Sequence, residues 1–161
     1  VDAAAPKGVQ DELRSRVAIR PGIDFLQHQV MPVGQVAAER ALLLDESYNK
    51  GVLHTAFITV ESVGEALGGS YQRAREHFDR AVGLSEGLDA GPYIAMAVGV
   101  SIVEENRQEF VELLETVLAI DVDKEPANRL FNVLSQKRAR MLLDHVDDLF
   151  FEPIPEEPGA V

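Results

Sequence analysis

Apolar residues recur at spacings of three and four along most of the chain, which is the period of an amphipathic α-helix. A first helix is predicted from Gln35 to Asp45, and its apolar positions are Val36, Ala37, Ala41, Leu42 and Leu44. A longer helix is predicted over Asn49–Leu67 and ends at a pair of glycines, Gly68 and Gly69. Its apolar stripe comprises Val52, Leu53, Ala56, Val60 and Val63.

Start signals divide the rest of the chain into four further helical stretches. Ser70 is placed to cap one helix, and Pro92 stands in the first turn of the next. Asn106 and Glu109 have the spacing of a capping box, and Pro126 opens a last long helix. The helix after Ser70 is expected to have the apolar stripe Ala74, Phe78, Ala81 and Val82. The stripe expected after Asn106 is Phe110, Leu113, Leu114, Val117 and Leu118, and the stripe expected after Pro126 is Leu130, Leu134, Met141 and Leu142.

The helical pattern contains a repeat. No segment alternates apolar and polar residues with the β-branched enrichment of a strand, so the expected fold class is all-α. Three helix ends resemble one another: ERALLLD (39–45), DRAVGLS (79–85) and ETVLAID (115–121). Ala74, Phe78 and Ala81 have the spacing of the second helix of a tetratricopeptide repeat, whose period is about 34 residues. We therefore expect antiparallel helical hairpins stacked as degenerate tetratricopeptide-like repeats.

The pattern also suggests a domain organisation. Residues 1–34 form a poorly defined N-terminal segment, in which Gln10–Ala18 and Ile23–Val30 are compatible with short helices. Residues 35–151 form the predicted helical-repeat domain. Residues 152–161 form a tail rich in proline and glutamate, which predicts an extended or disordered chain.

Composition narrows the classes of partner and site. The formal net charge of the 161 residues is −12 at pH 7, which argues against nucleic acid or an anionic membrane surface as a partner. The absence of cysteine excludes disulfides, zinc–thiolate sites and thiol nucleophiles. No stretch approaches the ~18 apolar residues of a membrane span. The first residues, VDAAAPKG, do not resemble a signal peptide, so we expect the signal to be absent from this sequence.

The segment GGSYQRAREHFDRAVGLSEG (68–87) allows two interpretations. It could be a glycine loop that holds an anion beside a proton-transferring histidine, or the hinge and second arm of a helical hairpin. It lacks the glycine patterns of phosphate-binding loops, which favours the hinge. His77 has no second ligand at the spacing of a metal site. We expect it at the edge of the buried stripe, with Arg75 paired to Asp79 on the surface.

The remaining polar residues give weaker signals. His54 occurs beside Phe57, and we expect it to face the groove between hairpins. The acidic stretch from Glu104 to Glu125 is expected to be a solvated face, with an acidic docking surface as the alternative; it lacks the pattern of a calcium loop. At least one basic residue of the last helix is expected to form a structural ion pair with the acidic helix before it. No catalytic motif occurs, so we expect no enzyme, no cofactor and no metal site.

Several longer motifs, taken in order, resemble one family. They are RALLLDESYNKGVLHT, GGSYQRAREHFDRAV, GPYIAMA, NRQEFVELLETVLAIDVD and NRLFNVLSQKRARMLLDHVDDLF. Over roughly residues 35–151 they resemble the T component associated with TRAP transporters (TatT), a family of tetratricopeptide-like helical proteins. The resemblance implies a periplasmic lipoprotein that binds the transporter's solute-binding receptor, and assembly as a trimer with a channel through each protomer. It also implies a role in handing on a hydrophobic or organic-acid ligand.

The comparison with the family adds expectations about this chain. The signal and lipobox of the family are expected to be absent, and the chain is expected to correspond to the C-terminal half of such a protein. The candidates for contact with a ligand are Tyr48, His54, Phe57, His77 and Tyr93. The alternative function is a general helical-repeat scaffold that binds another protein and no small molecule.

Overall fold

The computed structural model describes residues 36–150 of the chain. The helices considered at Gln10–Ala18 and Ile23–Val30 and the tail predicted at 152–161 lie outside the described residues, so the predicted domain boundaries stay a prediction. The chain divides into two compact units between Leu44 and Asp45, and each is described by itself. In the first unit, residues 36–44 form a helix, which confirms the first predicted helix.

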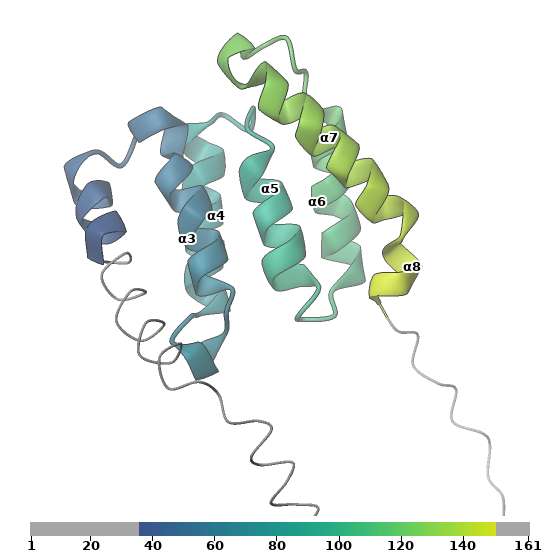
Figure 1. The fold of residues 1–161 in the computed structure, drawn as a ribbon, viewed down its shortest axis with the longest axis horizontal. Helices are drawn as coiled ribbons and strands as arrows, with labels where there is room; N and C mark the ends of the chain where they lie inside the picture. Colours follow the sequence, from purple (N-terminus) through teal and green to yellow (C-terminus); the bar gives the residue numbers. More distant parts are fainter. Residues whose placement is uncertain (1–35, 151–161) are drawn as a thin grey trace, which may run out of the picture. The chain divides into compact units, whose positions relative to one another are not determined.

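The second unit is built from helices, and no strand occurs among the described residues, which confirms the all-α prediction. Its elements are η1 (Tyr48–Gly51), α3 (Val52–Glu61), η2 (Glu65–Leu67), α4 (Tyr71–Leu84), α5 (Gly91–Met96), the π-helical turn η3 (Ala97–Ser101), α6 (Arg107–Ala119), η4 (Pro126–Asn128), α7 (Arg129–Asp144) and α8 (Val146–Leu149). Figure 1 shows α3 and α4 as one antiparallel pair and α5 and α6 as the next, with α7 against α5 and α6. The assignment of these hairpins to tetratricopeptide-like repeats stays a prediction.

The helix predicted over Asn49–Leu67 is wrong at both ends. Residues 48–51 form a 3₁₀ turn, and α3 ends at Glu61. Gly64 has a φ of 82°, a left-handed conformation that glycine adopts without steric cost. The chain therefore leaves the helix before the glycine pair, and the short turn η2 follows.

The glycine pair and the serine after it form the predicted hinge. Gly68 ends η2 with a φ of 86°. A Cβ atom on Gly69 would lie 2.3 Å from the carbonyl oxygen of Glu61, so no other residue fits there without a backbone shift. Ser70 caps α4, because its Oγ accepts a hydrogen bond from the N–H of Arg73 at 3.3 Å. The hinge interpretation of this segment is confirmed.

The buried face of α3 differs from the predicted apolar stripe. Its buried residues are His54, Phe57, Ile58 and Glu61. Two of these four side chains are polar, and the apolar pattern therefore missed them. Glu61 is 4% exposed and forms an ion pair with Arg73, whose Nη2 lies 2.7 Å from its Oε2.

The core follows the predicted stripes of α4 and α6. Around α5 and α6, one apolar cluster buries Ala90, Tyr93, Ile94, Ala97, Phe110, Leu114, Val117, Ile120, Ala139 and Phe150. A smaller cluster joins α3 and α4 to α5 and η3 through Ile58, Ala74, Met96 and Val100. Ala74, Ala81, Phe110, Leu114 and Val117 are buried as the spacing predicts. This core holds α3 and α5 in fixed positions relative to one another.

The start of α6 uses only half of the predicted capping box. Asn106 Oδ1 accepts a hydrogen bond from the N–H of Glu109 at 3.1 Å. The Glu109 carboxylate does not accept a hydrogen bond from the N–H of Asn106. It accepts hydrogen bonds from the guanidinium of Arg75 and from the Oγ of Ser101 instead. The predicted surface pair between Arg75 and Asp79 is therefore wrong. The guanidinium of Arg75 instead joins α4 to α6 and holds the pKa of the Glu109 carboxyl below its usual range.

The predicted apolar stripe of α7 is wrong for Leu130, Leu134 and Met141, whereas Leu142 is partly buried against the core as predicted. The large apolar residues that α7 exposes are Leu130, Phe131, Leu134 and Met141. The residues that it buries are Asn132, Ser135 and Ala139. α7 thus presents small and polar side chains to the core over most of its length, and Leu142 and Leu143 pack there near its C-terminal end.

Two amide side chains of α7 bind backbone groups of neighbouring elements. Asn132 is fully buried; its Oδ1 accepts from the N–H of Ala90 at 3.1 Å and its Nδ2 donates to the carbonyl of Leu88 at 2.8 Å. Gln136 donates to the carbonyl of Ile120 at 2.9 Å, just beyond the end of α6. Hydrogen bonds to backbone groups that lack helical partners therefore set the position of α7.

The ion pair predicted between the basic last helix and the acidic helix before it is wrong for the described residues. Arg129 Nε lies 2.7 Å from Oδ1 of Asp123, which belongs to the loop before α7. No basic residue of α7 forms an ion pair with α6 in this part of the chain. The other basic side chains of α7 therefore remain available for other contacts.

Candidate functional site

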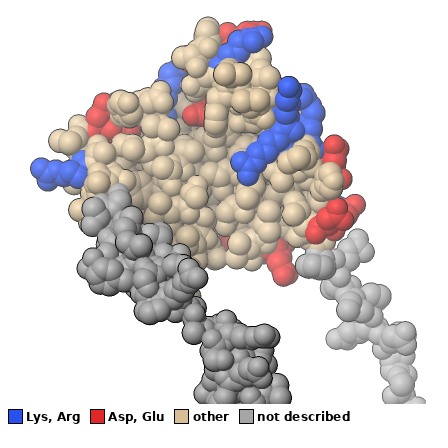
Figure 2. All heavy atoms as spheres, in the orientation of Figure 1, with Lys and Arg blue, Asp and Glu red and all other residues tan. Residues whose placement is uncertain are grey.

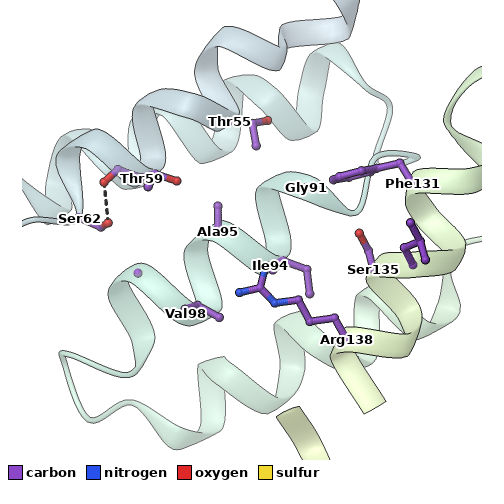
Figure 3. A pocket seen from close by; sticks show the side chains of 12 residues that line it. Thr55, Thr59, Ser62, Gly91, Ile94, Ala95, Val98, Phe131, Ser135 and Arg138 are labelled. Atoms are coloured by element: carbon purple, nitrogen blue, oxygen red, sulfur yellow. Dashed lines mark hydrogen bonds between the residues drawn. The ribbon is translucent and has the colours of Figure 1, made fainter. Parts of the chain in front are cut away.

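A groove lies between α3, α5 and α7 (Figure 3). Its volume is about 520 Å³, within the range of ~300–1,000 Å³ that small-molecule sites usually have. Hydroxyl side chains at the α3 side form one wall, apolar residues of α5 and η3 form the floor, and α7 forms the second wall. The wall at α3 consists of Thr55, Thr59 and Ser62, and the floor consists of Ile94, Ala95 and Val98. The wall at α7 consists of Phe131, Leu134, Ser135 and Arg138.

Two glycines at the floor set the width of the groove. A Cβ atom on Gly91 would lie 3.2 Å from Cγ2 of Thr55, and one on Gly99 would lie 2.7 Å from Oγ of Ser62. Any larger residue at Gly99 would push η3 away from the end of α3. Both glycines thus allow the close approach of helices from which the groove is made.

Arg138 is the one charged residue among those that line the groove. Its side chain extends over the apolar floor toward Ile94 and Val98 (Figure 3). It has no ion pair with any described residue. Figure 2 shows basic side chains gathered over α7, beside a broad and largely uncharged surface over α3 and α5. The groove therefore combines an apolar floor with a single cation at its edge.

A second polar cluster lies on the side of α3 that faces α4. The Nδ1 atoms of His54 and His77 are 2.8 Å apart. The ring of Phe57 stacks on His77, with 4.9 Å between centroids and 15° between planes. Nε2 of His54 lies 3.2 Å from Oε1 of Glu46, which also forms an ion pair with Arg80 at 2.6 Å.

This arrangement fits two neutral histidine rings. A neutral imidazole has one donor and one acceptor nitrogen. If His54 donates from Nε2 to Glu46, its Nδ1 accepts and the Nδ1–H of His77 donates. Protonation of both rings would place an N–H group on each Nδ1 atom, so that two donors would face each other without an acceptor. Burial first, and then the charge of His54, lower the pKa of His77 below its ordinary value.

The histidine pair predicts that stability falls in mild acid. The folded-state pKa of His77 is lowered, so the unfolded chain binds more protons as the pH falls below ~6.5. The contribution to stability is therefore complete above that pH and is lost as the pH falls toward the folded-state pKa. We expect the urea midpoint to drop between pH 7.5 and 5.5 in the native chain. The other charged groups that act on His77 are Glu61, Glu76 and Arg73.

Two substitutions separate this effect from general acid sensitivity. His77→Gln keeps a polar side chain that does not titrate, so the fall in midpoint over this interval should become smaller. His145→Gln is the matched control, because His145 is exposed and bonds only the carbonyl of Met141. An equal fall in both variants would show that the histidine pair does not cause it.

The structure brings three of the five predicted ligand residues together. His54, Phe57 and His77 contact one another between α3 and α4. Tyr93 is buried in the core, where its ring meets Phe78 edge-on at 5.5 Å. Tyr48 lies apart in η1 and is 61% exposed. None of the five lines the groove.

The groove residues were not predicted from the sequence. A signal was present in the hydroxyls of Thr55, Thr59 and Ser62, which recur at helical spacing on a face of α3 away from its buried residues. The small residues Gly91 and Gly99 were a second signal. Neither points to a groove without knowledge of where α7 packs.

Other site classes find no support in the described residues. No group of three or more potential ligands could hold a metal ion in this part of the chain. Within the acidic stretch, Glu104 and Glu109 pair with Arg75. None of the described helices combines the length and apolar character needed to cross a membrane.

Comparison with known proteins adds a family match to this geometry. The model of the family described as "TRAP transporter T-component" matches residues 23–150. A protein of Treponema pallidum (strain Nichols), described as uncharacterized, is 35% identical over 115 residues. The alignment covers 71% of this chain and 36% of that protein. The chain thus spans about a third of the length of this relative.

Proposed function

The chain belongs to the TRAP transporter T-component family, and on that premise we propose that it is an accessory component of a TRAP-type transport system. In this role it binds the solute-binding receptor of the system and passes on a hydrophobic or organic-acid ligand. The family is one of transport components and not a class of enzymes. The proposal also includes a periplasmic location, a lipid anchor on the whole protein and assembly as a trimer.

The observation that carries the ligand part of the proposal is the groove between α3, α5 and α7. It has the size of a small-molecule site and an apolar floor, and it lies between three helices. A component that passes on a ligand needs such a surface, and it needs the ligand to leave again. An open groove meets both needs better than a closed cavity.

A second function is favoured by the exposed apolar residues of α7. Leu130, Leu134 and Met141 are each more than half exposed, at 72%, 54% and 56%. Exposed apolar patches often mark surfaces that bind other proteins. The alternative is therefore a helical scaffold that binds a protein partner through α7 and uses no small molecule.

The experiment that tests the proposed function is an affinity purification. The chain is immobilised and exposed to periplasmic extract of the native organism, and retained proteins are identified by mass spectrometry. We expect a TRAP solute-binding receptor among the retained proteins. The control is an unrelated helical protein of similar negative charge, because a net charge of −12 attracts basic proteins non-specifically.

Two outcomes would count against the proposal. Retention of the receptor by the control protein at the same level would show that charge alone explains it. Retention of other proteins without the receptor would favour the scaffold.

A further inference from the structure

We propose that the groove binds a small monocarboxylate with an apolar body. The guanidinium of Arg138 and the hydroxyl of Ser135 hold the carboxylate, and Ile94, Ala95 and Val98 contact the apolar body. The inference rests on the proposed function for its biological role, since it names the class of ligand that is passed on. The binding itself needs no receptor and can be tested alone.

The first observation is that Arg138 lacks a partner. Five arginines on α4, α6 and α7 each form an ion pair with a carboxylate; they are Arg73, Arg75, Arg80, Arg107 and Arg129. Arg138 and Arg140 of α7 form none with a described residue, and of these two only Arg138 lines the groove. Arg138 has no such contact with a described residue, although the chain carries a large excess of acidic side chains. A guanidinium at the edge of an apolar groove is suited to a carboxylate, which it can bind through two parallel hydrogen bonds.

The second observation is an unpaired hydroxyl on the same wall of the groove. Ser135 is 7% exposed, lines the groove and has no hydrogen-bond partner among the described residues. Hydroxyls within helices usually bond the carbonyl four residues earlier, as Ser85 and Thr116 do here. Ser135 does not. Its hydroxyl therefore remains free to donate to a ligand.

The two groups lie on the same side of α7. Ser135 and Arg138 are three residues apart, which places them on neighbouring positions of one helix face. Figure 3 shows both side chains directed from α7 into the groove, with the guanidinium of Arg138 beside Ile94. A carboxylate placed there can accept from the guanidinium with one oxygen and from the hydroxyl with the other.

The rest of the lining sets the class of ligand. No carboxylate and no second cation lines the groove in the described part of the chain. A dicarboxylate would leave one charge on an apolar floor without a partner, which costs free energy. A neutral molecule can accept hydrogen bonds from Arg138 and Ser135, but it leaves the guanidinium without a counter-charge. An anion with one carboxylate and an apolar body pairs with both polar groups of α7 and covers the apolar floor.

The test is isothermal titration calorimetry of the full chain with three probes of equal length. Octanoate carries one carboxylate, 1-octanol carries none, and suberate carries one at each end. We expect saturable binding of octanoate, with affinity at least about tenfold higher than for either other probe, as the loss of a charge-assisted hydrogen bond predicts.

Variants assign the binding to the two residues. Arg138→Gln should weaken octanoate binding by about tenfold or more and leave 1-octanol unchanged, because it removes the cation and keeps the stem length similar. Ser135→Ala should weaken octanoate binding by about threefold to tenfold, the effect of one neutral donor. Arg140→Gln is the matched control, since Arg140 is exposed on the same helix and does not line the groove.

Three results would overturn the inference. These are equal affinity for octanoate and 1-octanol, equal loss in Arg138→Gln and Arg140→Gln, and no binding of octanoate by a chain that is folded by circular dichroism. None of these three results concerns receptor binding, so the proposed function would stand if the receptor still associates with the chain. Octanoate binding without receptor association would in turn keep the groove assignment and reject the role in transport.

Discussion

Asn132→Ala is expected to lower the free energy of unfolding by about 2–4 kcal/mol. It leaves the buried N–H of Ala90 unpaired, at a cost of about 1–3 kcal/mol, and removes a part-buried hydrogen bond to Leu88 that contributes about 0.5–1.5 kcal/mol. Asn132 is fully buried. Its amide accepts from the N–H of Ala90 and donates to the carbonyl of Leu88. Alanine can do neither. Urea denaturation of both chains measures the difference.

Asn128→Ala is the matched control for this prediction. Asn128 precedes α7 but makes no side-chain cap hydrogen bond, so its loss should change the free energy of unfolding by no more than about 0.5 kcal/mol. If the two variants lose the same amount, the amide of Asn132 does not hold α7 in place. The assigned shape of the groove would then lose its main support.

Gly69→Ala is expected to destabilise the chain by about 3 kcal/mol, the upper part of the range for overpacking. The added Cβ would lie 2.3 Å from the carbonyl oxygen of Glu61 and 3.0 Å from the amide nitrogen of Gly64. Both are backbone atoms, so no side chain can move aside to relieve the contact. The hinge between α3 and α4 must shift instead. Thermal and urea denaturation both measure the loss.

A second glycine provides the opposite expectation. Gly83 lies inside α4, and a Cβ atom there would meet nothing within 4 Å. Gly83→Ala should therefore stabilise the chain by up to about 1 kcal/mol, because alanine has the higher helix propensity. Similar changes in both variants would mean that the close approach at Gly69 does not exist.

Local signals in the sequence predicted the parts of the fold that depend on local chemistry. Ser70 and Asn106 cap the helices that they were expected to cap, because a cap is an interaction between residues three positions apart. The hinge at Gly68 and Gly69 was predicted for the same reason. The stripe of α6 was predicted because its buried residues are all apolar.

The buried faces of α3 and α7 could not be predicted in this way. Both bury polar side chains, such as Glu61 on α3 and Asn132 on α7, whose partners are distant in the sequence. An apolar periodicity counts these residues as exposed. It also placed Leu130 and Leu134 in the core, although both face outward.

The candidate site was predicted only in fragments. The sequence singled out His54, Phe57 and His77 individually, but a spacing of 23 residues does not reveal that the two histidines make a hydrogen bond. The groove depends on α3, α5 and α7 meeting in space. Its unpaired polar groups, Thr55 on α3 and Ser135 and Arg138 on α7, stand out only when the partners of the other polar residues are known.

The central claim is that this chain serves a TRAP transporter by binding its solute-binding receptor. The most direct measurement is light scattering of the purified chain mixed with the purified receptor from the same organism. The account predicts a saturable complex with the summed mass of its components. Two separate species at about 100 μM of each protein, where even a complex of micromolar affinity would be formed, would contradict it.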